Sequence, residues 1–319
     1  MRRTPTQQRL VAAMATILVA VTSGATTAGA APTPASSTDA PLRVIVSEDI
    51  EPGERPVFEV VHTDAAGFVE LLLDPTVDQV GLDGTGRLQW SPTDPAYGAQ
   101  WEHHHTGVEV AWDVTRGSSD VVMAIVDSGV NPGPEFGDRL LPGISFVGGD
   151  PTVDLLGHGT SVASVAAGAA NNDFGGAGVC SECKILPVQA ATPNGSVPWS
   201  ASAEGVIWAV DNGADVINLS FGGQSESQLL ADALAYAAAQ GVVVVASAGN
   251  YGTDAGVYPA ANPTVLSAAG HDPAFGRYPW SSYGPWVDVA APGCTTAVSG
   301  TGIGTVCGTS FASPWTAGL

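Results

Sequence analysis

The segment VVMAIVDSG, residues 121–129, contains six apolar, largely β-branched residues directly before an aspartate and a turn. A short apolar run without polar alternation is typical of a strand buried on both faces. Residues 216–219 and 242–246 form runs of the same kind. Together these runs indicate a sheet at the centre of a domain, covered on both sides.

Alanine-rich stretches with helical character lie between these strands, at residues 160–168, 201–210 and 227–240. Gly213 and Gly241 follow two of them and are typical helix stops. Alternation of strands and helices predicts an α/β fold with a mostly parallel sheet between helices. In such folds the functional side chains gather at the carboxyl ends of the strands.

Composition narrows the classes of partner. The 319 residues include 10 Lys plus Arg against 31 Asp plus Glu, which gives a net charge of −21. Such acidity favours solubility and argues against nucleic acid or an anionic membrane as a partner.

The N-terminus has the order of an export signal. Arg2, Arg3 and Arg9 precede an apolar run at residues 10–21, and small residues follow at 28–30. This order predicts a secretory signal peptide over residues 1–30, with an ordinary buried helix as the alternative. The apolar run is too short to span a bilayer comfortably. We therefore expect a secreted, extracellular protein with no membrane segment in its mature form.

Residues 31–95 differ in character from the alternation that follows. Residues 31–40 are rich in Ala, Pro, Ser and Thr and predict a flexible lead-in. A small unit with strand-like runs comes next, at residues 43–46, 57–62 and 77–82. A linker containing Gly and Pro follows over 83–100. We predict a small α+β unit and linker over residues 31–95, and the larger domain over 96–319.

Four cysteines allow three pairings, and export permits disulfides. Pairing Cys180 with Cys183 and Cys294 with Cys307 closes the shortest loops, and we favour it. A zinc site is the alternative, since Cys-x-x-Cys resembles half of one, but the second pair is thirteen residues apart. The contiguous run at 103–105, three histidines, fits no defined metal site and predicts an exposed turn.

Two residues with catalytic potential lie near the first predicted strand and the first helix. Asp127 follows the strand, which puts a carboxylate at its carboxyl end. His158 lies in GHGT, residues 157–160, before the alanine-rich run. Each also has a plain explanation, because Asp-Ser-Gly is good turn chemistry and a lone histidine is usually structural.

Two further residues follow later strands. Asn250 ends SAGN after the strand at 242–246, and either donates its amide to an oxyanion or adopts a left-handed turn. Ser310 lies in GTSFASP, at a predicted helix start with free backbone N–H groups near it, or is a simple N-cap. Pro314 is tolerated in a first helical turn.

In the order Asp, His, Asn, Ser these segments resemble the subtilisin-like (subtilase) family of serine proteases. The resemblance runs from about Trp112 to the last residue and rests on five segments: AIVDSGV (124–130), GHGT (157–160), NLSFGG (218–223), SAGN (247–250) and GTSFASP (308–314). It implies a three-layer subtilisin-like α/β fold, a self-removed pro-region and a serine endopeptidase. The Asp–His–Ser chain order is the one known for subtilisin itself.

The resemblance also implies a role for each residue. Ser310 would be the nucleophile, His158 its base and Asp127 the residue that orients the imidazole. Asn250 and the Ser310 N–H would form the oxyanion hole. Catalysis would need no cofactor.

Further implied roles concern the substrate, a polypeptide. In the family, Ser220-Phe221-Gly222 is an edge that pairs with the substrate backbone. Ala248 and Gly249 would line the primary specificity pocket, and Val257 would form its floor, which implies an apolar preference. The protein's own pro-region would be a second partner, and a monomer is expected.

The loop at 171–178 resembles a family loop that binds structural Ca²⁺, with Asn172 as a side-chain ligand and Glu135 in the place of a family aspartate. A metal-free turn is the alternative. Phe311 replaces a common methionine and Ser161 a frequent histidine, and neither change affects a named catalytic atom.

Nine residues follow Ser310, whereas family members continue further, so we expect a C-terminal part to be missing and this fragment to be impaired. Two other classes of function remain open. A pseudoenzyme that binds polypeptides would not need all four polar residues together. A hydrolase of non-peptide esters would not need the edge at 220–222.

Overall fold

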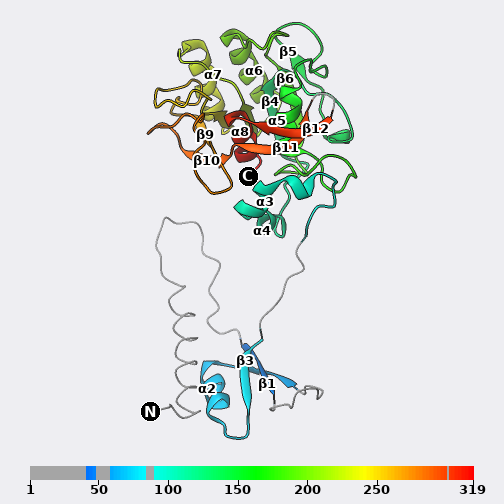
Figure 1. Cartoon of the computed structure of the whole chain (residues 1–319), viewed down its shortest axis with the longest axis vertical. Coiled ribbons are helices and arrows are strands. Elements are labelled where there is room, and N and C mark those ends of the chain that lie inside the picture. Colours follow the sequence, from blue (N-terminus) through cyan, green and yellow to red (C-terminus); the bar gives the residue numbers. More distant parts are fainter. Residues whose placement is uncertain (1–40, 48–57, 84–89, 300–301) are drawn as a thin grey trace. The chain divides into compact units, whose positions relative to one another are not determined.

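The computed structural model describes residues 41–47, 58–83, 90–299 and 302–319; the predicted signal peptide and the lead-in at 31–40 lie outside them. The chain divides into two compact units, residues 1–88 and 89–319 (Figure 1). Within the described residues, none of the helices combines the length and apolar character needed to cross a bilayer.

The first unit is a small α+β structure. Its antiparallel sheet has the order β2-β1-β3, formed by Leu42–Ser47 (β1), Phe58–Thr63 (β2) and Gln79–Leu82 (β3). Helix α2, Ala65–Leu73, lies between β2 and β3 in the chain. Asp64 caps this helix, since its Oδ1 accepts the N–H of Gly67 at 2.8 Å. The sequence predicted the three strands but did not locate the helix.

The second unit is built on a seven-stranded sheet of order β10-β9-β8-β7-β4-β6-β5, in which every neighbouring pair is parallel. The strands are Val122–Asp127 (β4), Ile144–Ser145 (β5), Lys184–Gln189 (β6), Val216–Leu219 (β7), Val243–Ser247 (β8), Leu266–His271 (β9) and Val289–Pro292 (β10). The predicted parallel sheet is confirmed, and the strands at 121–126 and 242–246 lie one residue further along.

Helices cover both faces of this sheet, which makes three layers (Figure 1). The helices are His158–Ala167 (α5), Trp199–Asp211 (α6), Gln228–Ala239 (α7) and Thr309–Ala317 (α8). Alternate residues of β4 point to opposite faces. Met123 and Ile125 pack with α5 and α8, whereas Ala124 and Val126 pack with α6 and α7. The expected three-layer α/β fold is confirmed.

The two predicted helix stops end α6 and α7. Gly213 and Gly241 have φ values of 81° and 80°, in the left-handed region where glycine costs least. After each glycine, a backbone N–H returns to the last helical turn: Ala214 to Ala209 O and Val242 to Ala237 O, both at 3.0 Å. These bonds are those of the Schellman motif, which commonly ends a helix at a glycine.

Short elements complete the second unit. They are Tyr97–Ala99 (η1), Trp101–Thr106 (α3), Val108–Trp112 (α4), Gly137–Arg139 (η2) and the antiparallel hairpin of Cys294–Ser299 (β11) with Gly302–Cys307 (β12). The prediction of an exposed turn at the three histidines is wrong, because they lie in α3. His103 is 1% exposed, and its Nε2 lies 2.9 Å from Ala177 O. Burial lowers the pKa of His103 to about 4, so it is a neutral core residue.

Candidate active site

Asp127 and His158 form a hydrogen-bonded pair at the carboxyl end of β4. Asp127 is the last residue of the strand and is buried, and His158 is the first residue of α5. Asp127 Oδ1 lies 2.8 Å from His158 Nδ1 and also accepts the Ser128 N–H at 2.7 Å. Gly159 permits this approach, since a Cβ there would lie 2.2 Å from Gly129 O and 3.1 Å from the Asp127 Cβ.

The charge of Asp127 acts on His158. The carboxylate raises the pKa of the imidazole above its usual value; burial opposes this shift, and the hydrogen bond to Asp127 and the charge of Asp154 add to it. With Nδ1 bonded to a carboxylate, the proton of the neutral ring lies on Nδ1. Nε2 is then free to accept a proton.

Ser310 is the second residue of α8, after Gly308 with a φ of 147°. The N–H of Ser310 lies in the first turn, where helical amides have no partner within the helix. His158 lies close to this turn, because its ring centroid is 5.9 Å from that of Phe311.

Pro314 is the sixth residue of α8, so its expected place in the first turn is wrong. A proline has no N–H for the carbonyl four residues earlier, which is that of Ser310. That carbonyl instead accepts the Ser220 hydroxyl at 2.8 Å. The side chain that follows β7 thus replaces a missing helical hydrogen bond.

The hydroxyl of Ser310 donates to Ser220 O at 3.1 Å. Within the described part of the chain, no hydrogen bond joins it to His158. Hydrogen bonds between catalytic groups are often absent or long in unliganded structures, so this arrangement does not exclude Ser310 as a partner of His158.

Asn250 lies beside the same helix start. Its Oδ1 accepts the Thr309 N–H at 2.9 Å and the Thr309 hydroxyl at 3.0 Å. The amide nitrogen has no hydrogen-bond partner among the residues that the structure describes, and Asn250 is exposed. A donor therefore lies at the solvent side of the turn that contains Ser310.

Two glycines expected to bind substrate, Gly222 and Gly249, lie against Val257. This side chain is fully buried, and Cβ atoms added at Gly222 and Gly249 would lie 2.9 Å and 3.0 Å from its Cγ1. Gly223 and Tyr258 exchange two backbone hydrogen bonds of 2.8 Å, which join the segment after β7 to the one that contains Val257. Ala248 is buried at the end of β8. Val257 packs directly against Gly222 and Gly249, and neither position can take a side chain without a shift of its neighbours.

The model of the subtilase family matches residues 118–319, which is more than half of the chain. The chain belongs to the subtilase family. It is 40% identical over 251 residues to the thermophilic serine proteinase of Bacillus sp. (strain AK1), covering 77% of this chain and 63% of that protein.

Other relatives give the same assignment. Thermitase of Thermoactinomyces vulgaris is 38% identical over 236 residues, covering 72% of this chain and 84% of thermitase. A solved protease of Pseudoalteromonas arctica PAMC 21717 superposes with a TM-score of 0.67 at 30% identity, covering 72% of this chain and 85% of that one. This subtilase spans less than two thirds of the Bacillus proteinase.

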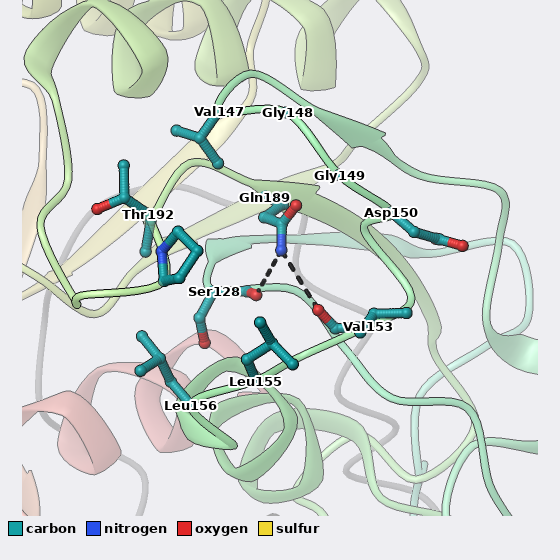
Figure 2. Close-up of a pocket in the computed structure, with 12 residues that line it drawn as sticks. Ser128, Val147, Gly148, Gly149, Asp150, Val153, Leu155, Leu156, Gln189 and Thr192 are labelled. Atoms are coloured by element: carbon teal, nitrogen blue, oxygen red, sulfur yellow. Dashed lines mark hydrogen bonds between the residues drawn. The ribbon is translucent and has the colours of Figure 1, made fainter.

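A cavity of about 200 Å³ opens beside Asp127 in this subtilase, at the carboxyl ends of β4, β5 and β6. Figure 2 shows Gln189 at its centre, where Nε2 donates to Ser128 O at 3.0 Å and to Val153 O at 3.4 Å. Leu155 and Leu156 form part of the wall and are exposed. The sequence did not predict this cavity.

Glu135 and Asn172, the predicted calcium ligands, lie in adjoining segments. The Asn172 amide donates to Pro134 O at 2.9 Å, and its Oδ1 accepts the Phe174 N–H at 2.9 Å. Glu135 is buried; Oε1 accepts the Ser164 hydroxyl and Oε2 has no partner among the described residues. Burial raises the pKa of Glu135 to about 7. No group of three or more His, Cys, Asp or Glu side chains in the described residues is placed to hold a metal.

The cysteines form the two pairs with the shortest loops, Cys180–Cys183 and Cys294–Cys307. No cysteine is left for zinc among the described residues. The second disulfide joins the two ends of the β11–β12 hairpin, and the Gly308 N–H that follows it donates to Gly293 O at 2.8 Å. The disulfide and this hydrogen bond therefore hold together the two strand ends that directly precede α8.

Two buried residues to which the sequence assigned no role, Asn218 and Ser313, hold this region together. Asn218 is fully buried in β7; its Oδ1 accepts the Ser313 hydroxyl at 2.7 Å, and its Nδ2 donates to Ser220 Oγ at 2.9 Å. These bonds link α8 to the strand next to it. The signal in the sequence is that Asn218 interrupts an apolar strand, where a polar side chain needs a partner.

Proposed function

We propose that the chain is the catalytic part of a secreted serine endopeptidase. The observation that supports this best is the 2.8 Å contact between Asp127 Oδ1 and His158 Nδ1, beside the helix start that contains Ser310. The Bacillus relative, named a serine proteinase, and the solved structure, named a protease, support the reaction class.

In this mechanism Ser310 Oγ attacks the carbonyl carbon of the substrate peptide bond, and its proton passes to His158 Nε2. Asp127 stabilises the imidazolium that forms. His158 then returns the proton to the departing amine as the carbon–nitrogen bond breaks, which leaves an ester on Ser310. Water, activated by the same imidazole, hydrolyses the ester and restores the hydroxyl.

The negative charge on the substrate oxygen requires donors in place before the reaction. We assign these donors to Asn250 Nδ2 and the Ser310 N–H. The orientation of the Asn250 amide, fixed by Thr309, supports the first. The place of the Ser310 N–H in the first turn of α8, where an amide has no helical partner four residues earlier, supports the second. Preorganised donors of this type lower the barrier because no reorganisation is needed.

Polypeptide recognition is assigned to the segments around Val257. Ser220, Phe221 and Gly222 would pair with the substrate main chain, a mode that tolerates many sequences. The apolar Val257 floor between Gly222 and Gly249, with Ala248 beside it, supports a preference for apolar side chains in the primary pocket.

Casein and a short-chain ester, offered at equal enzyme concentration, test the reaction class. We expect casein hydrolysis by the mature protein and its near-complete loss in Ser310→Ala. Ester hydrolysis without proteolysis would favour the non-peptide esterase, and intact binding of casein without cleavage would favour the pseudoenzyme.

We propose that Glu135 and Asn172 help to hold a structural Ca²⁺. The buried Oε2 of Glu135, which has no partner among the described residues, supports this, because a buried carboxylate oxygen without a hydrogen bond or ion is costly. Ca²⁺ would neutralise it, with backbone carbonyls and water completing the six to eight oxygens that the ion prefers. EGTA should then lower the melting temperature and Ca²⁺ restore it, while Glu135→Gln should not respond. A wild-type melting curve unmoved by EGTA would contradict the assignment.

A further inference from the structure

Asp154 lies between the end of β4 and the start of α5 and makes an unusual number of hydrogen bonds. It is buried, at 6% exposure. Its Oδ1 accepts the Ser128 hydroxyl and the Gly157 N–H, both at 2.8 Å, and the Leu156 N–H at 3.1 Å. Its Oδ2 accepts the N–H and the hydroxyl of Thr160, at 2.8 Å and 2.7 Å. The carboxylate is therefore fully satisfied.

These bonds replace a cap that α5 lacks. The residue before the helix is Gly157, with a φ of 72°, and it has no side chain to accept the first free amides. Asp154 accepts the N–H groups of Gly157 and Thr160, and Ser128 Oγ accepts that of Gly159 at 2.9 Å. The helix that begins with His158 is thus capped from outside.

Ser128 connects this cap to Asp127. A hydroxyl has one hydrogen, and the Ser128 group lies 2.8 Å from Asp154 Oδ1 but 3.2 Å from Asp127 Oδ1. The shorter contact goes to Asp154. The carboxylate of Asp154 therefore accepts hydrogen bonds both from Ser128, which follows Asp127, and from the backbone on either side of His158.

We propose that Asp154 is a positioning residue that sets the geometry of the Asp127–His158 pair. It contacts neither substrate nor the reacting atoms, and acts by holding Ser128 and the first turn of α5 in one arrangement. The proposal rests on the proposed function, in which this pair activates Ser310. Asp154 and Asp127 are also the two charged groups whose fields raise the pKa of His158, Asp127 by more.

Asp154→Asn tests the proposal in the whole chain, because it keeps the shape and replaces one acceptor oxygen by a donor. Facing N–H groups and hydroxyls, that donor must displace part of the cap. We expect kcat on a peptide substrate to fall by about tenfold to a hundredfold, the scale for a small misplacement of catalytic groups. KM should change by less than about twofold, because ground-state binding is not involved.

Asp150→Asn is the matched control. Asp150 lies in the same loop and has the same Asp-to-Thr pattern, accepting the Thr152 N–H at 2.9 Å and the Thr152 hydroxyl. In the described chain it has no hydrogen bond to α5 or Ser128. The kcat of Asp150→Asn should equal that of the wild type. A lower melting temperature of Asp154→Asn with unchanged kcat and KM is the opposing result. That result would show that Asp154 only stabilises the turn, and it would overturn the proposal.

A titration of the His158 imidazole by NMR, in the Ser310→Ala background, gives a readout that needs no activity. We expect Asp154→Asn to lower the pKa of His158 and Asp150→Asn to leave it unchanged. An unchanged pKa of His158 in Asp154→Asn overturns the proposal. If Asp154→Asn does not fold, Ser128→Ala decides, with an expected fall in kcat of about twofold to tenfold. A wild type without proteolysis would refute the proposed function, and the titration would still test the coupling.

Discussion

The side-chain oxygen of Asn250 accepts both hydrogen-bond donors of Thr309, the backbone N–H at 2.9 Å and the hydroxyl at 3.0 Å. A backbone N–H can only donate, so the group that faces it must be the amide oxygen. The orientation of the amide is therefore determined, and Nδ2 turns away from Thr309. Since Thr309 precedes Ser310, the amide is fixed to the helix start that contains the proposed nucleophile.

Asn250→Ala should lower kcat by about a hundredfold to a thousandfold and leave KM nearly unchanged, because one oxyanion donor is lost. Thr309→Val is a second informative variant, because it removes the hydroxyl that bonds Asn250 but keeps the backbone N–H. It should lower kcat by about tenfold or less. Steady-state kinetics on a peptide substrate measure both. An unchanged kcat in Asn250→Ala would exclude Asn250 from the mechanism.

The pH profile should depend on the charge of Asp127. His158 must be neutral to accept a proton, so kcat/KM should rise as pH rises through its pKa, which Asp127 holds above the usual value. Asp127→Asn removes the largest cause of that shift. The acid limb should move to lower pH, while kcat falls by about ten-thousandfold. If the acid limb of the kcat/KM profile lies at the same pH in Asp127→Asn as in the wild type, a group other than His158 titrates there.

Stability should depend on pH through Glu102. Its side chain is buried in α3; Oε1 accepts the Thr295 hydroxyl, and Oε2 has no partner among the described residues. Burial raises the pKa of Glu102 to about 7, above that of an unfolded glutamate, about 4.3. The folded state thus binds the proton more tightly, and the contribution of Glu102 is fully present below about pH 4 and lost as pH rises through 7.

Glu102→Gln should therefore raise the melting temperature at pH 8 more than at pH 5. Glu204→Gln, at an exposed position in α6, is the control and should have little effect at either pH. Thermal melts at both pH values measure the difference. Equal effects of Glu102→Gln at pH 5 and pH 8 would contradict a titrating Glu102.

The sheet and its helices could be predicted because local patterns determine them. Apolar runs such as 121–126 are readable without tertiary context, and so are the stops at Gly213 and Gly241. The segment from Trp90 to Asp94 could not be assigned in this way. It resembles a linker in composition, yet Asp94 accepts the N–H groups of Asn171 at 2.7 Å and Asn172 at 2.9 Å, far away in the sequence.

The candidate site was predictable to the extent that it follows short motifs, as with Asp127, His158 and Ser310. Residues that act through long-range contacts gave no such signal. Asp154 is one of several aspartates in an acidic chain, and only the folded structure brings it to Ser128 and the start of α5. His103 was assigned to an exposed turn because nothing nearby in the sequence indicates the burial of α3.

We propose that the pro-region is removed by the enzyme itself, at a bond at or before Trp90. The Trp90 N–H donates to Asp113 Oδ1 at 3.1 Å, and its ring meets that of Trp112 edge-on at 5.5 Å. Loss of these contacts and of the hydrogen bonds that Asp94 accepts from Asn171 and Asn172 would destabilise the second unit. N-terminal sequencing and intact mass should find Trp90 in the mature wild type.

Ser310→Ala, purified from a host without extracellular proteases, should accumulate as the uncleaved precursor beginning near Ala31. Maturation of this variant at the same bond and rate would show that another protease makes the cut. A mature wild type that begins after Asp94 would contradict the position of the cut.

Covalent labelling by a fluorophosphonate, mapped by peptide mass spectrometry, tests the central claim most directly. The reagent needs an activated nucleophile, and its adduct identifies the residue. We predict one adduct, on Ser310, with labelling abolished in Ser310→Ala and strongly slowed in His158→Ala. An adduct on another residue, or undiminished labelling of Ser310→Ala, would contradict the assignment of Ser310, His158 and Asp127 as the catalytic residues.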